Sequence, residues 1–87
     1  MFVILVYYVN QKRVAKALKT CRAYLNWVQN SVFEGEMTEA NFKILKMKLE
    51  KIIDTSEDSI IIYTFRSTKY SRREIMGVEK NELTQFI

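Results

Sequence analysis

Two segments of the chain, residues 2–9 and 59–65, are apolar at most positions and contain mainly β-branched and aromatic residues. This pattern is typical of strands that are buried on both faces. The longer apolar run, residues 2–9, is far shorter than the roughly 20 residues that a membrane-spanning helix requires, so we expect no membrane segment. Both segments are predicted to be central strands of a sheet.

Two other segments place their apolar residues at helical spacing. Asn10 and Thr38 stand at positions where a side chain caps the first turn of a helix. The expected core stripes are Val14, Ala17, Leu18, Cys21 and Tyr24 or Leu25 in the first helix, and Phe42, Leu45, Leu49 and Ile52 or Ile53 in the second. Lysines occupy the opposite faces, so two amphipathic helices with basic outer surfaces are predicted.

The remaining segments predict shorter elements. Residues 25–37 read as two strands or a bulged hairpin, with a turn near Gln29–Ser31, and residues 54–58 read as an acidic turn. Residues 74–78, "EIMGV", indicate a short fifth strand, and residues 79–87 a tail. We therefore expect one domain over residues 1–78, followed by the tail.

The predicted order βαββαβ defines an α+β fold of the ferredoxin-like type, in which both helices cover one face of an antiparallel sheet. Such a sheet leaves its other face open, yet the two central strands are apolar on both faces. A chain of 87 residues also builds only a small core. A homodimer in which two sheets stack face to face satisfies both conditions.

Composition removes several kinds of chemistry. The chain has no histidine, which excludes Ser-His and Cys-His nucleophile systems. Its single cysteine cannot form an internal disulfide and fits a reducing compartment, so we expect a cytoplasmic protein.

The positive charges are unevenly distributed. The net charge is +4, and the first acidic residue of the chain is Glu34. Two basic clusters are candidates for binding nucleic-acid phosphates, namely Lys12, Arg13, Lys16 and Lys19 near the start and Arg66, Lys69, Arg72 and Arg73 near the end. The alternative for the first cluster is an ordinary solvated helix face.

Four stretches together resemble the CRISPR-associated protein 2 family: "VILVYYVN", the basic helix after it, "VQNSVFEGEMT" and "IIIYTFRS". The segment "QNSVFEGE" is the most specific of them. The resemblance implies a ferredoxin-like homodimer whose C-terminal strand is exchanged onto the partner's sheet. It further implies a role in spacer acquisition, in which the dimer bridges integrase subunits and holds double-stranded DNA. Several members of the family are described as magnesium-dependent nucleases acting on RNA or DNA.

The chain departs from this family at the proposed metal site. The family pattern ends its first strand with Tyr-Asp, whereas this chain has Tyr7-Tyr8, so Tyr8 occupies the position of the metal-holding aspartate. A neutral phenol is a poor ligand for Mg²⁺, which prefers carboxylates, phosphates and water. Glu34 and Glu36 are the only acids early enough in the chain to reach this position, from the predicted hairpin, and the alternative for both is solvated or edge-strand charge. We expect no metal and no cofactor here.

Four residues are carried over as candidates for the catalytic position: Tyr7, Tyr8, Arg13 and Phe33. The alternative for Phe33 is a place in the core or the dimer interface. The leading expectation is a dimeric adaptor that binds double-stranded DNA without catalysis. The alternative is a magnesium-dependent endonuclease of the same family, acting on RNA or DNA. A third and more distant alternative is a ribonuclease toxin on the same fold, as in the virulence-associated protein D family.

Overall fold

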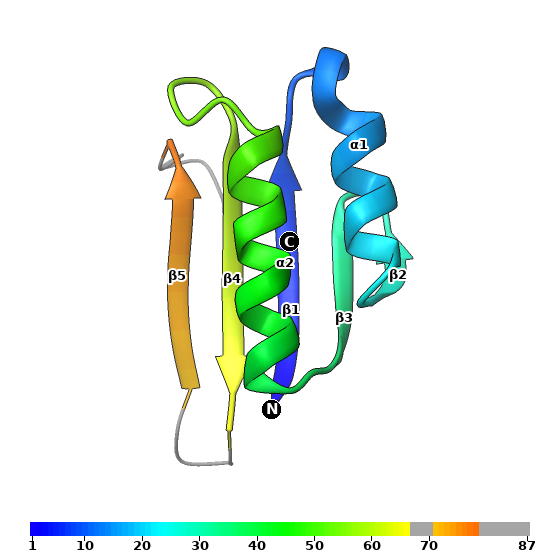
Figure 1. The fold of residues 1–87 in the computed structure, drawn as a ribbon, viewed down its shortest axis with the longest axis vertical. Coiled ribbons are helices and arrows are strands. Elements are labelled where there is room, and N and C mark those ends of the chain that lie inside the picture. The colour runs from blue at the N-terminus through cyan, green and yellow to red at the C-terminus, as the bar shows by residue number, and fades with distance from the viewer. Residues whose placement is uncertain (67–70, 79–87) are drawn as a thin grey trace.

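The computed structural model describes residues 1–66 and 71–78. Its elements are β1 (Phe2–Tyr8), α1 (Gln11–Arg22), β2 (Asn26–Gln29), β3 (Val32–Glu36), α2 (Glu39–Ile52), β4 (Ser59–Phe65) and β5 (Ser71–Gly77), as Figure 1 shows. Lys69 and the predicted tail, residues 79–87, lie outside the described residues.

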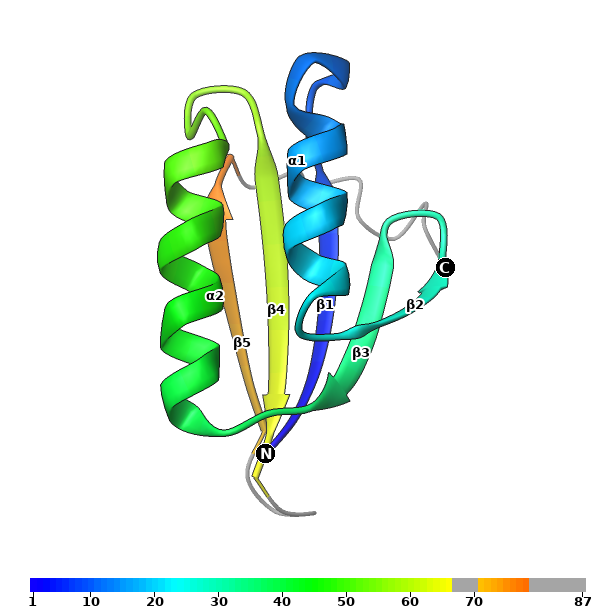
Figure 2. The same ribbon diagram turned by 45° about the vertical axis from the view of Figure 1, so that its right-hand side comes forward.

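The strands form one antiparallel sheet in the order β2-β3-β1-β4-β5. Each helix joins two strands that are separated by one other strand, and both helices lie on the same face of the sheet (Figure 2). This arrangement confirms the predicted α+β, ferredoxin-like fold. Neither helix in the described part of the chain is long and apolar enough to cross a membrane.

Both helices begin where the sequence predicts. The Asn10 side chain accepts a hydrogen bond from the Lys12 N–H (3.0 Å), and the Thr38 hydroxyl accepts one from the Asn41 N–H (3.1 Å). These bonds satisfy backbone donors that the first helical turn leaves without partners. The predicted stripes face the sheet, with Ala17 and Cys21 of α1 and Phe42, Leu45 and Leu49 of α2 buried.

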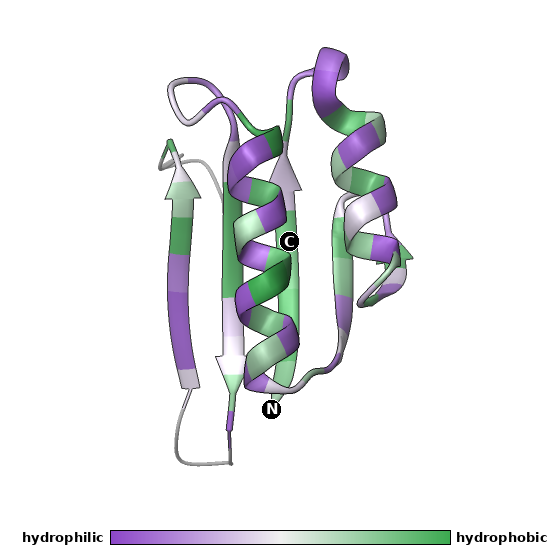
Figure 3. Cartoon of the chain, in the orientation of Figure 1, coloured by the Kyte–Doolittle hydropathy of each residue, from purple (hydrophilic) through white to green (hydrophobic). Residues whose placement is uncertain are grey.

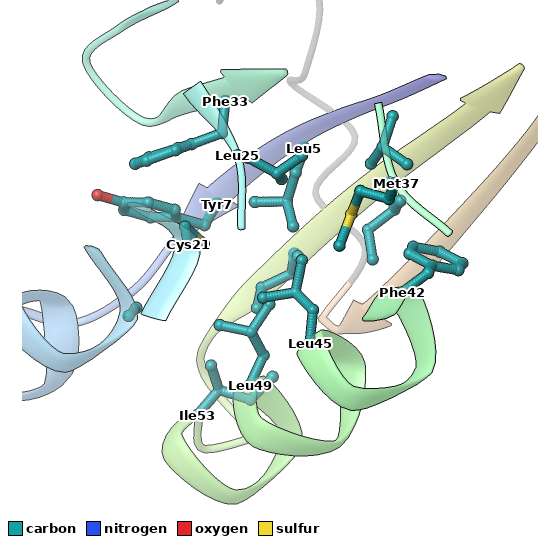
Figure 4. Packing of buried hydrophobic residues seen from close by; sticks show 14 residues of the cluster. Leu5, Tyr7, Cys21, Leu25, Phe33, Met37, Phe42, Leu45, Leu49 and Ile53 are labelled. Carbon is teal, nitrogen blue, oxygen red and sulfur yellow. The ribbon is translucent and has the colours of Figure 1, made fainter. Parts of the chain in front are cut away.

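The core lies between the helices and the sheet (Figure 4). On β1, Val3, Leu5 and Tyr7 point into this core, while the alternating residues Phe2, Ile4, Val6 and Tyr8 are half-buried on the open face. Figure 3 shows that β1 is hydrophobic over most of its length, whereas the first half of β5 is hydrophilic. The two-sided apolar pattern therefore reflects one face covered by the helices and a second face, called the open face below, on which no helix of the described residues packs.

The predicted bulged hairpin is formed by β2 and β3. Asn30 has a φ of 45° at the turn, a conformation that asparagine adopts more easily than most residues, and the register shifts between Trp27 and Gln29. The Trp27 indole N–H donates a hydrogen bond to the Asn30 carbonyl (2.8 Å) and fixes the turn.

The last strand is longer than the sequence predicts. It begins at Ser71 rather than at residue 74, and within the single chain it pairs with β4, from Phe65 opposite Ser71 to Ser59 opposite Gly77. Its exchange onto a partner's sheet in a dimer stays a prediction, whereas the early start is a difference from the sequence pattern. The reason is tertiary: Ser71–Arg73 lack an apolar strand pattern, but β4 offers them a complete edge to pair with.

Gly77 ends β5 against the turn before β4. Its φ is 91°, and a Cβ at this position would lie 2.0 Å from the Asp58 carbonyl oxygen. Only glycine allows such a close approach without displacing the backbone. The next residue, Val78, donates its N–H to the same carbonyl (2.9 Å).

Candidate functional site

The end of β1, where Tyr8 stands, meets the beginning of β4. Tyr8 lies opposite Ser59 in the register of the two strands, which brings the turn before β4 beside the turn after β1. A shallow cavity of about 250 Å³ opens there and is lined by Tyr8, Val9, Asn10, Glu57 and Asp58. The position of Tyr8, which the sequence resemblance predicts to be the metal position, therefore has two carboxylates next to it.

Asp58 is the most enclosed of these groups, with 1% of its surface exposed. Its Oδ1 accepts hydrogen bonds from the Asn10 N–H (3.0 Å) and from Arg13 Nη2 (3.1 Å). Its Oδ2 accepts from Arg13 Nε (2.7 Å) and from the Asp54 N–H (2.8 Å). Both carboxylate oxygens are thus fully engaged, and Asp58 joins β1, α1 and the turn after α2.

These contacts stabilise the charged form of the carboxyl. The pKa of Asp58 is lowered to about 2, chiefly because Arg13 donates hydrogen bonds to it. Burial alone would raise this pKa, but the hydrogen bonds from Arg13 and from the N–H groups of Asp54 and Asn10 together outweigh the effect of burial. Asp58 is therefore ionised at neutral pH and serves as an anchor rather than as a proton donor.

Arg13, predicted from the sequence as a site residue, is the partner of this anchor. Its guanidinium binds Asp58 with two nitrogens and also contacts Glu57, and its side chain is 22% exposed. The pKa of Arg13 is raised above its ordinary value, first by the hydrogen bond with Asp58 and then by that with Glu57. Its charge is therefore largely compensated before any ligand arrives.

The aromatic candidates divide between the two faces of the sheet. Tyr7 and Phe33 lie in the core, with 6% and 0% of their surfaces exposed and ring centroids 5.9 Å apart. Tyr8 lies on the open face, and burial raises the pKa of its phenol. Tyr8 is accordingly neutral at pH 7. Within the single chain, packing is the role that the structure gives to Tyr7 and Phe33.

The expectation that only Glu34 and Glu36 could reach this position is wrong. In the register they lie opposite Ile4 and Phe2, toward the other end of β1. The acids that do reach it, Glu57 and Asp58, are far away in the sequence. Their position could have been inferred, because in a ferredoxin-like sheet β4 runs antiparallel to β1, and the residue before β4 then lies beside the residues after β1.

The residues at this position do not fit a magnesium ion within the single chain. Tyr8 supplies a neutral phenol, and the oxygens of Asp58 already accept hydrogen bonds from four N–H groups. Residues 1–66 and 71–78 contain no group of three His, Cys, Asp or Glu side chains able to hold a metal ion. Cys21 is also no candidate nucleophile, because burial raises its pKa to about 12.

The two predicted basic clusters do not form one surface. Lys12, Lys16 and Lys19 are exposed on α1, which covers the side of the sheet away from β5 (Figure 1). Arg66 follows β4, and Arg72 stands near the start of β5, beside the end of the sheet opposite Tyr8. Arg73 lies opposite Tyr63 and points away from the helices, whereas Arg72 lies on the helix side.

The fold and these surfaces define a small ferredoxin-like protein with an open apolar sheet face, a basic helix and a rigid charged turn at the end of β1. A model of the family "CRISPR associated protein Cas2" matches residues 1–73. The chain belongs to this family, which confirms the resemblance seen in the sequence.

Similar proteins extend over the whole chain. The CRISPR-associated endoribonuclease Cas2 of Dictyoglomus turgidum is 56% identical over 87 residues and is covered completely, as is this chain. The protein of the same name from Thermotoga maritima is 51% identical over 82 residues, which are 94% of each chain. Among solved structures, a crystal structure of Cas2 matches with a TM-score of 0.74 and 41% identity, over 93% of this chain and 91% of that one. Streptococcus pyogenes Cas2 matches with a TM-score of 0.69 and 41% identity, over 75% of this chain and 86% of that one.

Proposed function

We propose that this chain is a nucleic-acid-acting subunit of a CRISPR system and that its activity is endoribonuclease cleavage. The observation that carries the proposal is the end-to-end match, at 56% and 51% identity, to proteins called CRISPR-associated endoribonucleases. These names favour the nuclease alternative over the adaptor without catalysis that led the sequence-based expectations.

The described residues contribute binding and rigidity to this function. Exposed lysines of α1 supply positive charge for a phosphate backbone, a kind of contact that does not depend on base sequence. Asp58 and Arg13 hold the turn at the start of that helix in one conformation. A divalent metal, where a nuclease uses one, polarises the phosphate and activates water. Because no carboxylate at Tyr8 is available to such an ion, we assign no step to it.

A second candidate function is supported by Tyr8 itself. If the missing carboxylate abolishes hydrolysis, the chain acts as an adaptor that binds double-stranded DNA and bridges integrase subunits in spacer acquisition. The full engagement of Asp58 favours this alternative, since the nearest buried carboxylate is not free to replace the aspartate.

Either function is proposed for a homodimer. The open face of the sheet carries apolar side chains that are half-buried or exposed, among them Phe2 and Phe65, whose ring centroids are 6.5 Å apart. Phe65 is 36% exposed in the single chain. A second copy packed face to face would remove this apolar surface from water, which is the usual driving force of association. Sedimentation of the purified chain measures this directly, and a single-chain mass at micromolar concentration would contradict it.

Cleavage and binding assays separate the two functions. The purified chain is mixed with labelled single-stranded RNA and duplex DNA, with Mg²⁺ or with a chelator. RNA cleavage is the result expected of the nuclease, and the comparison of Mg²⁺ with the chelator shows whether this cleavage requires a metal. Binding of duplex DNA without cleavage under any condition would overturn the nuclease proposal and favour the adaptor. Absence of both binding and cleavage would overturn both.

Substitution of Tyr8 sharpens this assay. Tyr8→Asp restores the carboxylate of the family pattern, and we expect Mg²⁺ uptake in calorimetry together with faster cleavage. Tyr8→Phe is the matched control, because it keeps the ring and adds no charge. If Tyr8→Asp takes up no more Mg²⁺ than Tyr8→Phe, Tyr8 does not occupy the metal position.

A further inference from the structure

A second concave surface lies on the helix side of the sheet, between α2 and β5. Two helices cover a sheet of five strands, and β5 lies beyond the edge of α2 (Figure 1). A hollow of about 320 Å³ results, within the range of pockets that hold small ligands. We call this hollow the α2–β5 groove. Its charged lining consists of Glu39, Lys43, Lys46, Arg66, Arg72 and Glu74.

Three separate elements supply the cations of the α2–β5 groove. Lys43 and Lys46 are three residues apart on α2 and share one face of the helix. Arg66 follows the end of β4. Arg72 stands opposite Thr64, on the side of β5 that faces the groove. Residues that are distant in the sequence thus converge on one hollow, unlike the lysines of α1, which follow one convex helix face.

The cations of the groove exceed its carboxylates. Lys46 Nζ lies 3.0 Å from Glu74 Oε1, and Arg66 pairs with Glu39. Among the described residues, Lys43 and Arg72 have no carboxylate partner. The six charged side chains therefore leave a net of two positive charges in a concave site, where an anion gains from both.

The two ion pairs play different roles. The side chains of Lys46 and Glu74 are only 31% and 25% exposed, and the pair lines both this hollow and the neighbouring one, so it forms a wall between them. The side chains of Arg66 and Glu39 are 64% and 60% exposed, and exposed pairs of this kind contribute little stability. Arg66 can consequently exchange Glu39 for another anion at small cost.

We propose that the α2–β5 groove binds phosphate groups of a nucleic-acid backbone, with Arg72 and Lys43 as the principal contacts. A guanidinium binds phosphate through two parallel hydrogen bonds, and an ammonium adds a point charge. This inference rests on the proposed action on nucleic acid and adds a contact surface remote from Tyr8 and from the exposed lysines of α1.

The test compares two double variants that remove the same charge. Arg72→Ala/Lys43→Ala empties the groove of its uncompensated cations. Arg22→Ala/Lys51→Ala removes two exposed cations at the ends of the two helices and is the matched control. Fluorescence anisotropy with labelled single-stranded RNA and duplex DNA, from 50 to 200 mM salt, gives the affinity and its salt dependence.

We expect the groove variant to bind at least tenfold more weakly at low salt. For duplex DNA, the slope of log affinity against log salt should fall by roughly 2, since each phosphate contact contributes about 0.9. The control should bind less than threefold more weakly and keep its slope. Two single variants extend this comparison. Arg72→Ala should lower the slope, whereas Arg72→Lys, which retains the charge, should keep most of it.

The possible failures are distinguishable. If the unsubstituted chain binds nucleic acid but both double variants weaken it equally, the groove proposal is overturned and the proposed function stands. If the unsubstituted chain binds neither RNA nor DNA, the proposed function fails with it. Urea unfolding of each variant establishes that it folds. A mononucleotide is added as a competitor: if it displaces RNA at equimolar concentration, the groove is a site for free nucleotides and the backbone site is rejected.

Discussion

Arg13 and Arg72 illustrate two uses of the same side chain at opposite ends of the sheet. Arg13, after β1, is bound by the buried carboxylate of Asp58 and by Glu57. Arg72, at the start of β5, has no carboxylate partner among the described residues and faces a groove of net positive charge. The charge of an arginine in a basic segment is therefore available to an anion only where the fold leaves that charge uncompensated.

The largest expected effect concerns the anchor at the end of β1. Asp58→Ala removes the acceptor of four N–H groups and leaves the Arg13 guanidinium without its main partner. We expect a loss of about 3 kcal/mol in the free energy of unfolding, at the lower end for a broken buried pair because Arg13 is partly exposed. Urea unfolding measures this loss.

The control for this prediction is Glu57→Gln, which removes the exposed partner of the same arginine. Its cost should stay below about 1 kcal/mol, as for surface ion pairs in general. Equal losses in Asp58→Ala and Glu57→Gln would show that burial does not distinguish the two carboxylates.

A smaller loss is expected from the strand that closes against the same turn. Gly77→Ala places a Cβ against the Asp58 carbonyl at a positive φ, so the end of β5 has to move away. We expect about 1–3 kcal/mol of destabilisation, in the range of a strained backbone position. Gly35→Ala is a control without positive φ, since its Cβ would come no closer than 3.4 Å to a neighbour. If both variants lose the same stability, the close approach at Gly77 is not the cause.

Acid should weaken the anchor in a defined pH window. The pKa of Asp58 is about 2 in the folded chain, below the value of 3.8 expected without these contacts. As pH falls, Asp58 is therefore protonated in the unfolded chain before it is protonated in the folded chain. The stabilisation by Asp58 is complete above pH 4 and is lost as pH falls through 2. The difference in urea midpoint between the unsubstituted chain and Asp58→Asn should narrow over this interval. A difference that is constant from pH 5 to pH 2 would contradict the assignment.

The smallest effect tests whether Arg13 contributes to binding at all. Glu57→Gln removes one of its two carboxylate partners, and we expect a two- to threefold gain in nucleic-acid affinity at low salt. Glu50→Gln, an exposed residue of α2, changes the net charge equally and serves as the control. The same gain in both variants would mean that only the net charge matters and that Arg13 remains unavailable.

Local patterns in the sequence were sufficient for most of the fold. Asn10 and Thr38 cap their helices through hydrogen bonds to nearby backbone groups, and the alternation of β1 follows from its residues alone. These features depend on neighbours in the chain, so a single sequence contains them.

Features that depend on distant pairing were missed. Asp58 reaches Arg13 only through the register of β4 on β1, and Ser71–Arg73 become a strand only because β4 offers an edge. For the same reason, the basic residues around Arg72 could not be assigned to one surface with Lys43 before the positions of α2 and β5 were known. The open face of the sheet, in contrast, was indicated by the two-sided apolar pattern of residues 2–9.

The most direct test compares Arg13→Ala with Arg72→Ala in the same two measurements, urea unfolding and the salt dependence of duplex DNA binding. Arg72→Ala should lower the slope of log affinity against log salt by about 1 and leave the free energy of unfolding unchanged. Arg13→Ala should lower the free energy of unfolding and change the slope less. The reverse pattern, with binding lost at Arg13 and stability lost at Arg72, would contradict the division between the two ends of the sheet.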